Sequence, residues 1–355
     1  MRDIWYLVLP LIISALITPV VKQIGYRLDA FAQMNERTVH HGKIVRIGGV
    51  AIYLAFIITM ALYVKTDMAM NGILIGSTIM FIGGLVDDLV NLKPLYKFSF
   101  QVVAAIVLIA SGVTLDVIRL PLGITINMGV VSFIVTFFWI TGITNAVNLI
   151  DGLDGLCGGI SVIILTVIAM LAVIEGRGDV EMIALILVGA TLGFLIYNAH
   201  PASIFMGDCG ALFLGFIISA ISLLGFKSST IMTLALPLLL LALPIIDTLS
   251  AILRRTLKGH KFSEADKSHI HHLLMNKFGH KNTVIIMCIV TALFGLTAYV
   301  YMINKGIGLI SLFVIMLAVD LFIEGSGMIS DKYHPILSVS RRIIRRLTRK
   351  KTITD

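Results

Sequence analysis

The stretch GVVSFIVTFFWITGITNAVNLIDGLDGLCGG, residues 129–159, contains two features that indicate the fold class. It begins with an apolar run, and about 20 apolar residues are enough for an α-helix to cross the hydrocarbon core of a bilayer. Asparagines, aspartates and glycines follow directly after this run. The stretch therefore predicts a membrane-spanning helix that ends in a polar loop at one membrane surface.

The rest of the chain has the same apolar character. Of the 355 residues, 58% are hydrophobic and 14% are charged, whereas soluble domains have about 45–50% and about 25%. The mean hydropathy of +0.99 excludes an intrinsically disordered chain. We expect an all-α integral membrane protein with about eleven transmembrane helices. The apolar runs lie near residues 4–21, 47–64, 71–86, 98–115, 129–147, 158–174, 180–197, 211–226, 230–253, 284–302 and 306–323.

The distribution of Lys and Arg predicts the orientation of these helices. The net charge of +8 indicates basic cytoplasmic loops rather than nucleic-acid binding, so no nucleic-acid partner is expected. With the N-terminus outside and the C-terminus cytoplasmic, the outer side holds few of the 28 basic residues. These few are Arg2, Lys65, Arg119, Arg177, Lys227 and Lys305. We expect a transmembrane domain over 1–325, with a cytoplasmic loop at 254–283, and a basic tail at 326–355 that is attracted to anionic membrane lipid.

Five aspartates lie on the predicted inner side. Asp87 and Asp88 end the third apolar run, Asp151 and Asp154 follow the fifth, and Asp208 follows the seventh. Carboxylates at a membrane edge are costly, so their positions indicate function. A solvated helix end is the alternative for the adjacent pair, but the helix dipole disfavours acids at that end.

Two polar motifs suit a ligand, and the second of them suits a nucleotide. Asn145 and Asn148 precede a glycine-rich turn in NAVNLIDGLDGL, and Asn198 and Phe205 lie in NAHPASIFMGD. Asparagine amides can pair with a base or a sugar, and a Phe ring can stack on a base. Glycine beside them lets a ligand approach the backbone closely.

Basic residues and histidines lie on the same predicted side. Lys93 and Lys97 are four residues apart, so if Pro94 begins a helix both ammonium groups lie on one side and can bind a phosphate. The alternative is that the two lysines only anchor the helices on the inner side of the membrane. His269, His271 and His272 lie in DKSHIHHLL, whose spacing matches no zinc motif, and the three cysteines are too scattered to form a zinc site or disulfide framework. The histidines can form hydrogen bonds with a phosphate. The alternative is that they are solvated residues of a loop.

Aspartates that gather at one membrane face repel one another unless a cation offsets their charge. Mg²⁺ does so with one or two carboxylates, and takes its other ligands from water and substrate phosphates. Mn²⁺ is the expected substitute. The sequence therefore predicts a Mg²⁺-dependent, phosphate-handling enzyme at the inner membrane surface.

The motifs, in their order along the chain, resemble those of the polyprenyl-phosphate N-acetylhexosamine-1-phosphate transferases. They are HGKIVRIGG with Lys43 and Arg46, the pair Asp87 and Asp88, NAVNLIDGLDGL, FMGD and HIHH. The spacing H-x-H-H is similar to that of the WecA and TagO branch, whereas MraY has three consecutive histidines. Arg254 and Arg255, in PIIDTLSAILRR, also look like that branch. The resemblance covers nearly the whole chain.

This resemblance implies transfer of GlcNAc 1-phosphate from UDP-GlcNAc to undecaprenyl phosphate, with release of UMP, in a cytoplasmic cleft of the bacterial inner (plasma) membrane. The product primes a cell-envelope glycan such as teichoic acid or O-antigen. The family pattern implies that Asp87, Asp88 and Asp208 are catalytic and that Asp208 and Asp88 hold Mg²⁺. The implied substrate-binding residues are Lys43, Arg46, Lys93, Lys97, Asn145, Asn148, Asp151, Asp154, Asn198, Phe205, Arg254, Arg255, His269, His271 and His272.

Two other functions stay open at this point. One is an ion-coupled secondary transporter that uses the carboxylates, although such sites tend to lie near the bilayer midplane. The other is an MraY-like transferase that uses UDP-MurNAc-pentapeptide. A homodimer and a covalent aspartyl intermediate also stay open, and we expect direct attack by the lipid phosphate.

Overall fold

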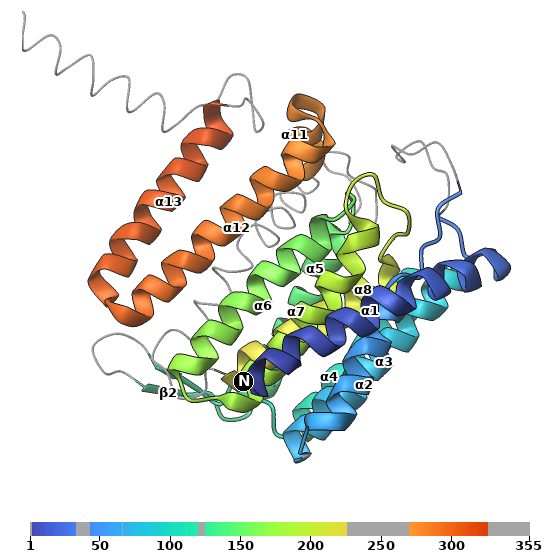
Figure 1. The fold of residues 1–355 in the computed structure, drawn as a ribbon. Helices are drawn as coiled ribbons and strands as arrows, with labels where there is room; N and C mark the ends of the chain where they lie inside the picture. Colours follow the sequence, from blue (N-terminus) through green and yellow to red (C-terminus); the bar gives the residue numbers. More distant parts are fainter. Residues whose placement is uncertain (1, 33–42, 66, 120–124, 226–269, 326–355) are drawn as a thin grey trace, which may run out of the picture.

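The computed structural model describes residues 2–32, 43–65, 67–119, 125–225 and 270–325. Within these ranges the protein is a bundle of helices with one small hairpin (Figure 1). The first helices are α1 (Arg2–Arg27), α2 (Gly49–Tyr63), α3 (Met68–Val90), α4 (Pro94–Ala110), α5 (Val131–Ile150) and α6 (Leu156–Ile174). They are followed by α7 (Gly178–Asn198), α8 (Gly207–Gly225), α11 (Ile270–Phe278), α12 (His280–Ile303) and α13 (Lys305–Gly325).

The helical, membrane-spanning character predicted from the sequence is confirmed. Seven described helices are long and apolar enough to cross a membrane, namely α1, α3, α5, α6, α7, α8 and α12. The helices α2, α4 and α13 contain shorter apolar stretches. Large apolar side chains such as Leu16, Phe138 and Phe313 are 67–69% exposed, as expected on a lipid-facing surface.

The predicted number and orientation of the helices stay predictions. The ninth apolar run, 230–253, and the tail, 326–355, lie outside the described residues. Two elements were not predicted. Strands β1 (Val117–Arg119) and β2 (Thr125–Asn127) form an antiparallel hairpin between α4 and α5, and α11 lies inside the predicted loop 254–283. Strands of three residues are too short for an alternation of apolar residues to show.

Helix α8 lies at the centre of the bundle (Figure 1). Every residue from Cys209 to Gly225 is buried, and α3 and α5 both pack against it. At the point where α3 meets α8, a Cβ atom on Gly84 would lie 2.5 Å from the carbonyl oxygen of Asp208. Glycine at this position therefore lets the end of α3 touch the start of α8, and this contact builds the site.

Candidate active site

Three aspartates from two helices meet at one end of the bundle. Asp87 and Asp88 lie in the last turn of α3, and Asp208 lies in the first turn of α8. One carboxylate oxygen of each lies within 4.8 Å of the others. The prediction that separate acidic segments gather is confirmed for these three residues.

Asp88 has hydrogen bonds on both carboxylate oxygens. Oδ1 accepts from Arg46 Nε at 3.0 Å and from the backbone N–H of Asp208 at 3.0 Å, and Oδ2 accepts from the N–H of Cys209 at 3.0 Å. The first N–H groups of a helix have no partner within that helix. Asp88 therefore caps α8 from a neighbouring helix, and its side chain is fully buried.

Arg46 is the cation beside Asp88. Its Nη2 lies 2.9 Å from Asp88 Oδ1 and 3.7 Å from Asp87 Oδ2, and its Nη1 donates to Asn91 Oδ1 at 3.1 Å. Burial lowers the pKa of Arg46, but the negative charge of Asp88 and its neighbours more than offsets this and raises the pKa above its ordinary value. Arg46 is therefore a permanent positive charge in the site.

Lys97, in the first turn of α4, joins the other two carboxylates. Its Nζ forms an ion pair with Asp208 Oδ2 and lies 3.1 Å from Asp87 Oδ2. Asp208 Oδ1 accepts from Asn148 Nδ2 at 3.1 Å, and Asp87 Oδ1 accepts from the N–H of Leu92 at 2.9 Å. Two carboxylates thus direct one oxygen each toward the same cation.

A pair of amides connects the helices that carry Lys97 and Asn148. Gln101 Nε2 donates to Asn145 Oδ1 at 3.0 Å, and Asn145 Nδ2 donates to Gln101 Oε1 at 2.9 Å. Gln101 lies one turn from Lys97 on α4, and Asn145 lies one turn from Asn148 on α5. This pair therefore fixes both side chains relative to Asp208. Gln101 was not predicted from the sequence. The signal that could have found it is its position as a polar residue inside an apolar helix.

Asp151 follows the last residue of α5 and is electrostatically coupled to the acidic cluster. Burial raises the pKa of Asp151 to about 8, and the negative charge of Asp208 and two other aspartates acts in the same direction. Asp151 is therefore largely protonated at pH 7 in this arrangement.

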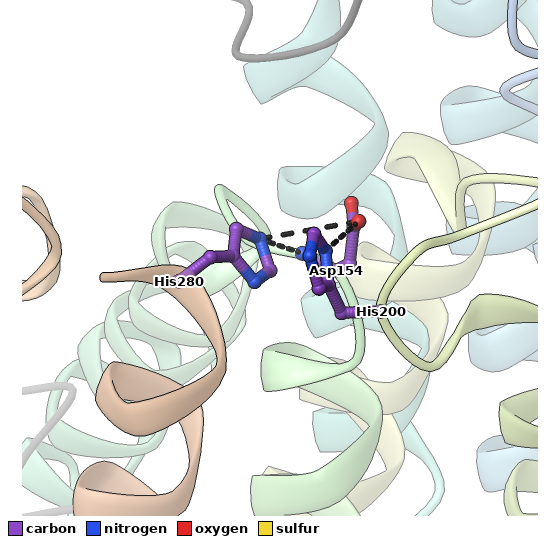
Figure 2. A group of neighbouring side chains, drawn as sticks. All are labelled: Asp154, His200 and His280. Atoms are coloured by element: carbon purple, nitrogen blue, oxygen red, sulfur yellow. Dashed lines mark hydrogen bonds and ion pairs between the residues drawn. The ribbon is translucent and has the colours of Figure 1, made fainter.

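The carboxylate of Asp154 lies in a second cluster with two histidines (Figure 2). Its Oδ2 is 2.9 Å from His200 Nδ1 and accepts from the N–H of Ala202 at 3.1 Å, while its own N–H donates to His280 Nε2 at 3.1 Å. The carboxylate of Asp154 is thus separate from the group formed by Asp87, Asp88 and Asp208, although its negative charge still acts on Asp151. Its carboxylate is buried against groups of the protein, and sequence reasoning missed both histidines because they lie far from Asp154 in the chain.

The other predicted residues are distributed differently. Asn198 accepts from the N–H of Gly155 at 3.1 Å and donates to the carbonyl of Ile204 at 2.9 Å, so it holds two loops together. Phe205 is half-buried; its backbone N–H donates to the carbonyl of Val45, and its carbonyl accepts from the N–H of Gly48, just before α2. Their contact with a nucleotide stays a prediction.

The two remaining lysines are exposed. Lys43 lies over the ring of Phe31, 5.2 Å from its centroid, and Lys93 directly precedes α4. His271 and His272 lie on α11. Arg254, Arg255 and His269 lie outside the described residues.

Comparison with known proteins agrees with the resemblance seen in the motifs. Residues 70–226 match the family described as Glycosyl transferase family 4. The chain is 37% identical over 345 residues, 96% of each chain, to a probable undecaprenyl-phosphate N-acetylglucosaminyl 1-phosphate transferase of Bacillus subtilis (strain 168). It is 32% identical over 315 residues to a decaprenyl-phosphate N-acetylglucosaminephosphotransferase of Mycobacterium tuberculosis, which covers 78% of this chain and 76% of the relative.

A phospho-N-acetylmuramoyl-pentapeptide-transferase of Streptococcus uberis is 30% identical over 250 residues, 64% of this chain and 74% of the relative. The similarity to the Bacillus protein extends over almost the whole chain, so it includes every helix of the acidic cluster. Together with the apolar helices, it identifies a multi-pass membrane enzyme. The chain belongs to glycosyl transferase family 4, the polyprenyl-phosphate N-acetylhexosamine-1-phosphate transferases.

Proposed function

We propose that this enzyme transfers GlcNAc 1-phosphate from UDP-GlcNAc to undecaprenyl phosphate in a Mg²⁺-dependent reaction that releases UMP. The observation that carries the proposal is the pair Asp87 and Asp208, which both direct a carboxylate oxygen toward the ammonium group of Lys97 where α3 meets α8. The printed names of the Bacillus and Mycobacterium relatives support a polyprenyl-phosphate acceptor and transfer of the sugar phosphate.

The chemistry of the site fits Mg²⁺. This ion uses one or two carboxylates and completes an octahedron with water and phosphate oxygens. Asp208 Oδ2 and Asp87 Oδ2 both face Lys97, whereas both oxygens of Asp88 are held by Arg46 and the start of α8. The resemblance implied Asp208 and Asp88 as metal ligands. We instead assign the direct ligand positions to Asp208 and Asp87, and the support of α8 to Asp88. Mn²⁺ is the expected substitute.

When bound, Mg²⁺ offsets charge on the diphosphate of the donor and on the departing UMP. A new bond forms between an oxygen of the lipid phosphate and the phosphorus that carries the sugar. The bond from that phosphorus to the bridging oxygen breaks, and UMP leaves with the electron pair. A phosphate monoester with a second pKa of about 6 is already largely dianionic at neutral pH. Direct attack therefore needs no general base, so Asp87 would hold the ion and position the acceptor phosphate rather than deprotonate it.

Two cations have separate tasks in this reaction. Arg46 is fixed by Asp88 and Asn91, so it maintains positive potential beside the phosphates. Lys97 has a flexible stem, and we propose that its ammonium turns from the two carboxylates to a phosphate of the donor. His271 and His272, on α11, are proposed to meet the sugar or the diphosphate.

A comparison of donors tests this function. Purified enzyme in detergent receives Mg²⁺, undecaprenyl phosphate and either labelled UDP-GlcNAc or labelled UDP-MurNAc-pentapeptide. We expect UMP and lipid-linked GlcNAc with UDP-GlcNAc, and no product in EDTA. Product from UDP-MurNAc-pentapeptide alone would assign the MraY-like reaction instead. Full activity in EDTA would exclude the proposed metal.

A further inference from the structure

The second polar cluster joins three distant parts of the chain (Figure 2). Asp154 precedes α6, His200 follows α7, and His280 is the first residue of α12. The side chains of Asp154 and His280 are 2% and 8% exposed. Buried polar groups need matched hydrogen bonds, so the three segments are tied together at one point.

The partners define which atoms donate. A carboxylate oxygen accepts hydrogen bonds, so Nδ1 of His200 carries the hydrogen in its 2.9 Å contact with Asp154 Oδ2. His280 Nε2 accepts from the backbone N–H of Asp154 at 3.1 Å. His280 therefore acts on the backbone of the loop, not mainly on the carboxylate, whose Oδ2 is 4.0 Å away.

This geometry favours hydrogen bonding over metal ligation. The two imidazole rings are stacked, with 4.1 Å between centroids and 22° between planes. Imidazoles that share a tetrahedral ion point toward it from diverging directions. In addition, the nitrogen of His280 that faces Asp154 is already occupied by a backbone N–H.

His280 lies at the junction between helices α11 and α12. Helix α11 ends at Phe278, and a single residue, Gly279 with a φ of +76°, separates it from His280. Figure 1 shows α11 beside the first turns of α12, and α12 packs along α6. The bond from His280 to the loop before α6 therefore fixes the junction between α11 and α12.

We propose that His280 is a positioning residue, which holds the α11–α12 junction against the loop that carries Asp151 and Asp154. It thereby places α11 beside the bound UDP-sugar. This inference rests on the proposed function for the role of α11, but the fixed junction itself does not depend on the identity of the donor.

Two variants of His280 separate positioning from general stability. His280→Phe keeps a ring that can stack on His200 but removes the acceptor, whereas the amide oxygen of His280→Gln can still accept from Asp154. We expect His280→Phe to raise the KM for UDP-GlcNAc about tenfold, with the kcat and the KM for undecaprenyl phosphate changed less than about twofold. His280→Gln is expected to recover most of the loss, and Lys281→Gln, at the exposed neighbouring position, serves as the control.

A second measurement needs no substrate. Trypsin cleavage after Lys277, in the last turn of α11, is followed by mass spectrometry. We expect faster cleavage in His280→Phe than in wild type or His280→Gln. Three results would contradict the proposal. They are equal cleavage rates in all proteins, an equal rise in KM for His280→Phe and His280→Gln, and a fall in kcat with an unchanged KM for UDP-GlcNAc. If wild type binds one equivalent of Zn²⁺ and His280→Phe binds none, His280 is a metal ligand and not a positioning residue. If wild type does not use UDP-GlcNAc, the proposed function fails, and the cleavage rates still decide the role of His280.

Discussion

The two polar clusters of this protein use aspartate in opposite ways. In the acidic cluster, Asp87 and Asp208 direct oxygens toward the ammonium group of Lys97, which is on a flexible stem. In the histidine cluster, the carboxylate of Asp154 is enclosed by a ring nitrogen of His200 and the N–H of Ala202. A mobile cation can give way to a metal ion, whereas fixed hydrogen-bond donors cannot. The partner of each aspartate, and not the aspartate itself, therefore decides whether its carboxylate can bind a metal ion.

Neutralising one aspartate in each cluster should reveal the largest difference between them. We expect Asp208→Asn to lower kcat about 10³-fold, because it removes a proposed ligand of Mg²⁺ and several kcal/mol of charge stabilisation. Asp154→Asn keeps an oxygen acceptor and should lose less than about tenfold. The measurement is the rate of UMP release, with elution as a single species as the control for folding. Similar losses in both variants would remove the distinction between the clusters.

The next largest effect concerns stability. Arg46→Met leaves the fully buried carboxylate of Asp88 without its cation, and an unmatched buried charge costs about 3–5 kcal/mol. We expect a clear fall in the Tm of the detergent-solubilised enzyme, and a smaller fall for Arg46→Lys. In the double variant Arg46→Met with Asp88→Asn, the effects should be less than additive. An unchanged Tm for Arg46→Met would show that Asp88 is matched in another way.

Replacing Lys97 tests whether its ammonium competes with the metal. Lys97→Met should lower kcat about 10- to 100-fold, because a proposed phosphate contact is lost. The same variant should reach half of its maximal rate at a lower Mg²⁺ concentration than wild type, since Asp87 and Asp208 no longer have a competing cation. Titration of activity with Mg²⁺ measures both quantities. A requirement for more Mg²⁺ would contradict the competition.

The last prediction concerns the pH dependence of stability. The pKa of Asp151 is about 8 in the folded protein, and that of aspartate in unfolded chains is about 3.9. Between these values the folded state binds a proton that the unfolded state releases, so this contribution to stability falls as pH rises from about 4 to about 8. Asp151→Asn removes it. The Tm of wild type in EDTA should therefore fall more steeply over this range than the Tm of the variant, and parallel profiles would argue against a raised pKa.

The sequence predicts the helices well because the bilayer imposes a length and a composition on each. The apolar run near 158–174 corresponds to α6, Leu156–Ile174, and that near 180–197 to α7, Gly178–Asn198. The distribution of basic residues also placed Asp87, Asp88 and Asp208 on one side, which allowed their convergence to be predicted.

The roles within the clusters could not be predicted in the same way. Asp87 and Asp88 are adjacent in sequence, but successive side chains on a helix point about 100° apart. Asp88 consequently meets the start of α8, while Asp87 meets Lys97. The contact between Asp154 and His280 joins residues 126 positions apart. Such pairings follow from tertiary packing, and no local pattern records them.

A single divalent-cation site at Asp87 and Asp208 is tested most directly by counting bound Mn²⁺ by electron paramagnetic resonance. Purified enzyme is titrated with Mn²⁺ in the presence of UMP, whose phosphate supplies the remaining type of ligand. We expect one Mn²⁺ per chain, displaced by Mg²⁺, in wild type and in Asp154→Asn, and none in Asp208→Asn. Equal binding in all three proteins, or a loss confined to Asp154→Asn, would contradict the assignment of the metal to the acidic cluster.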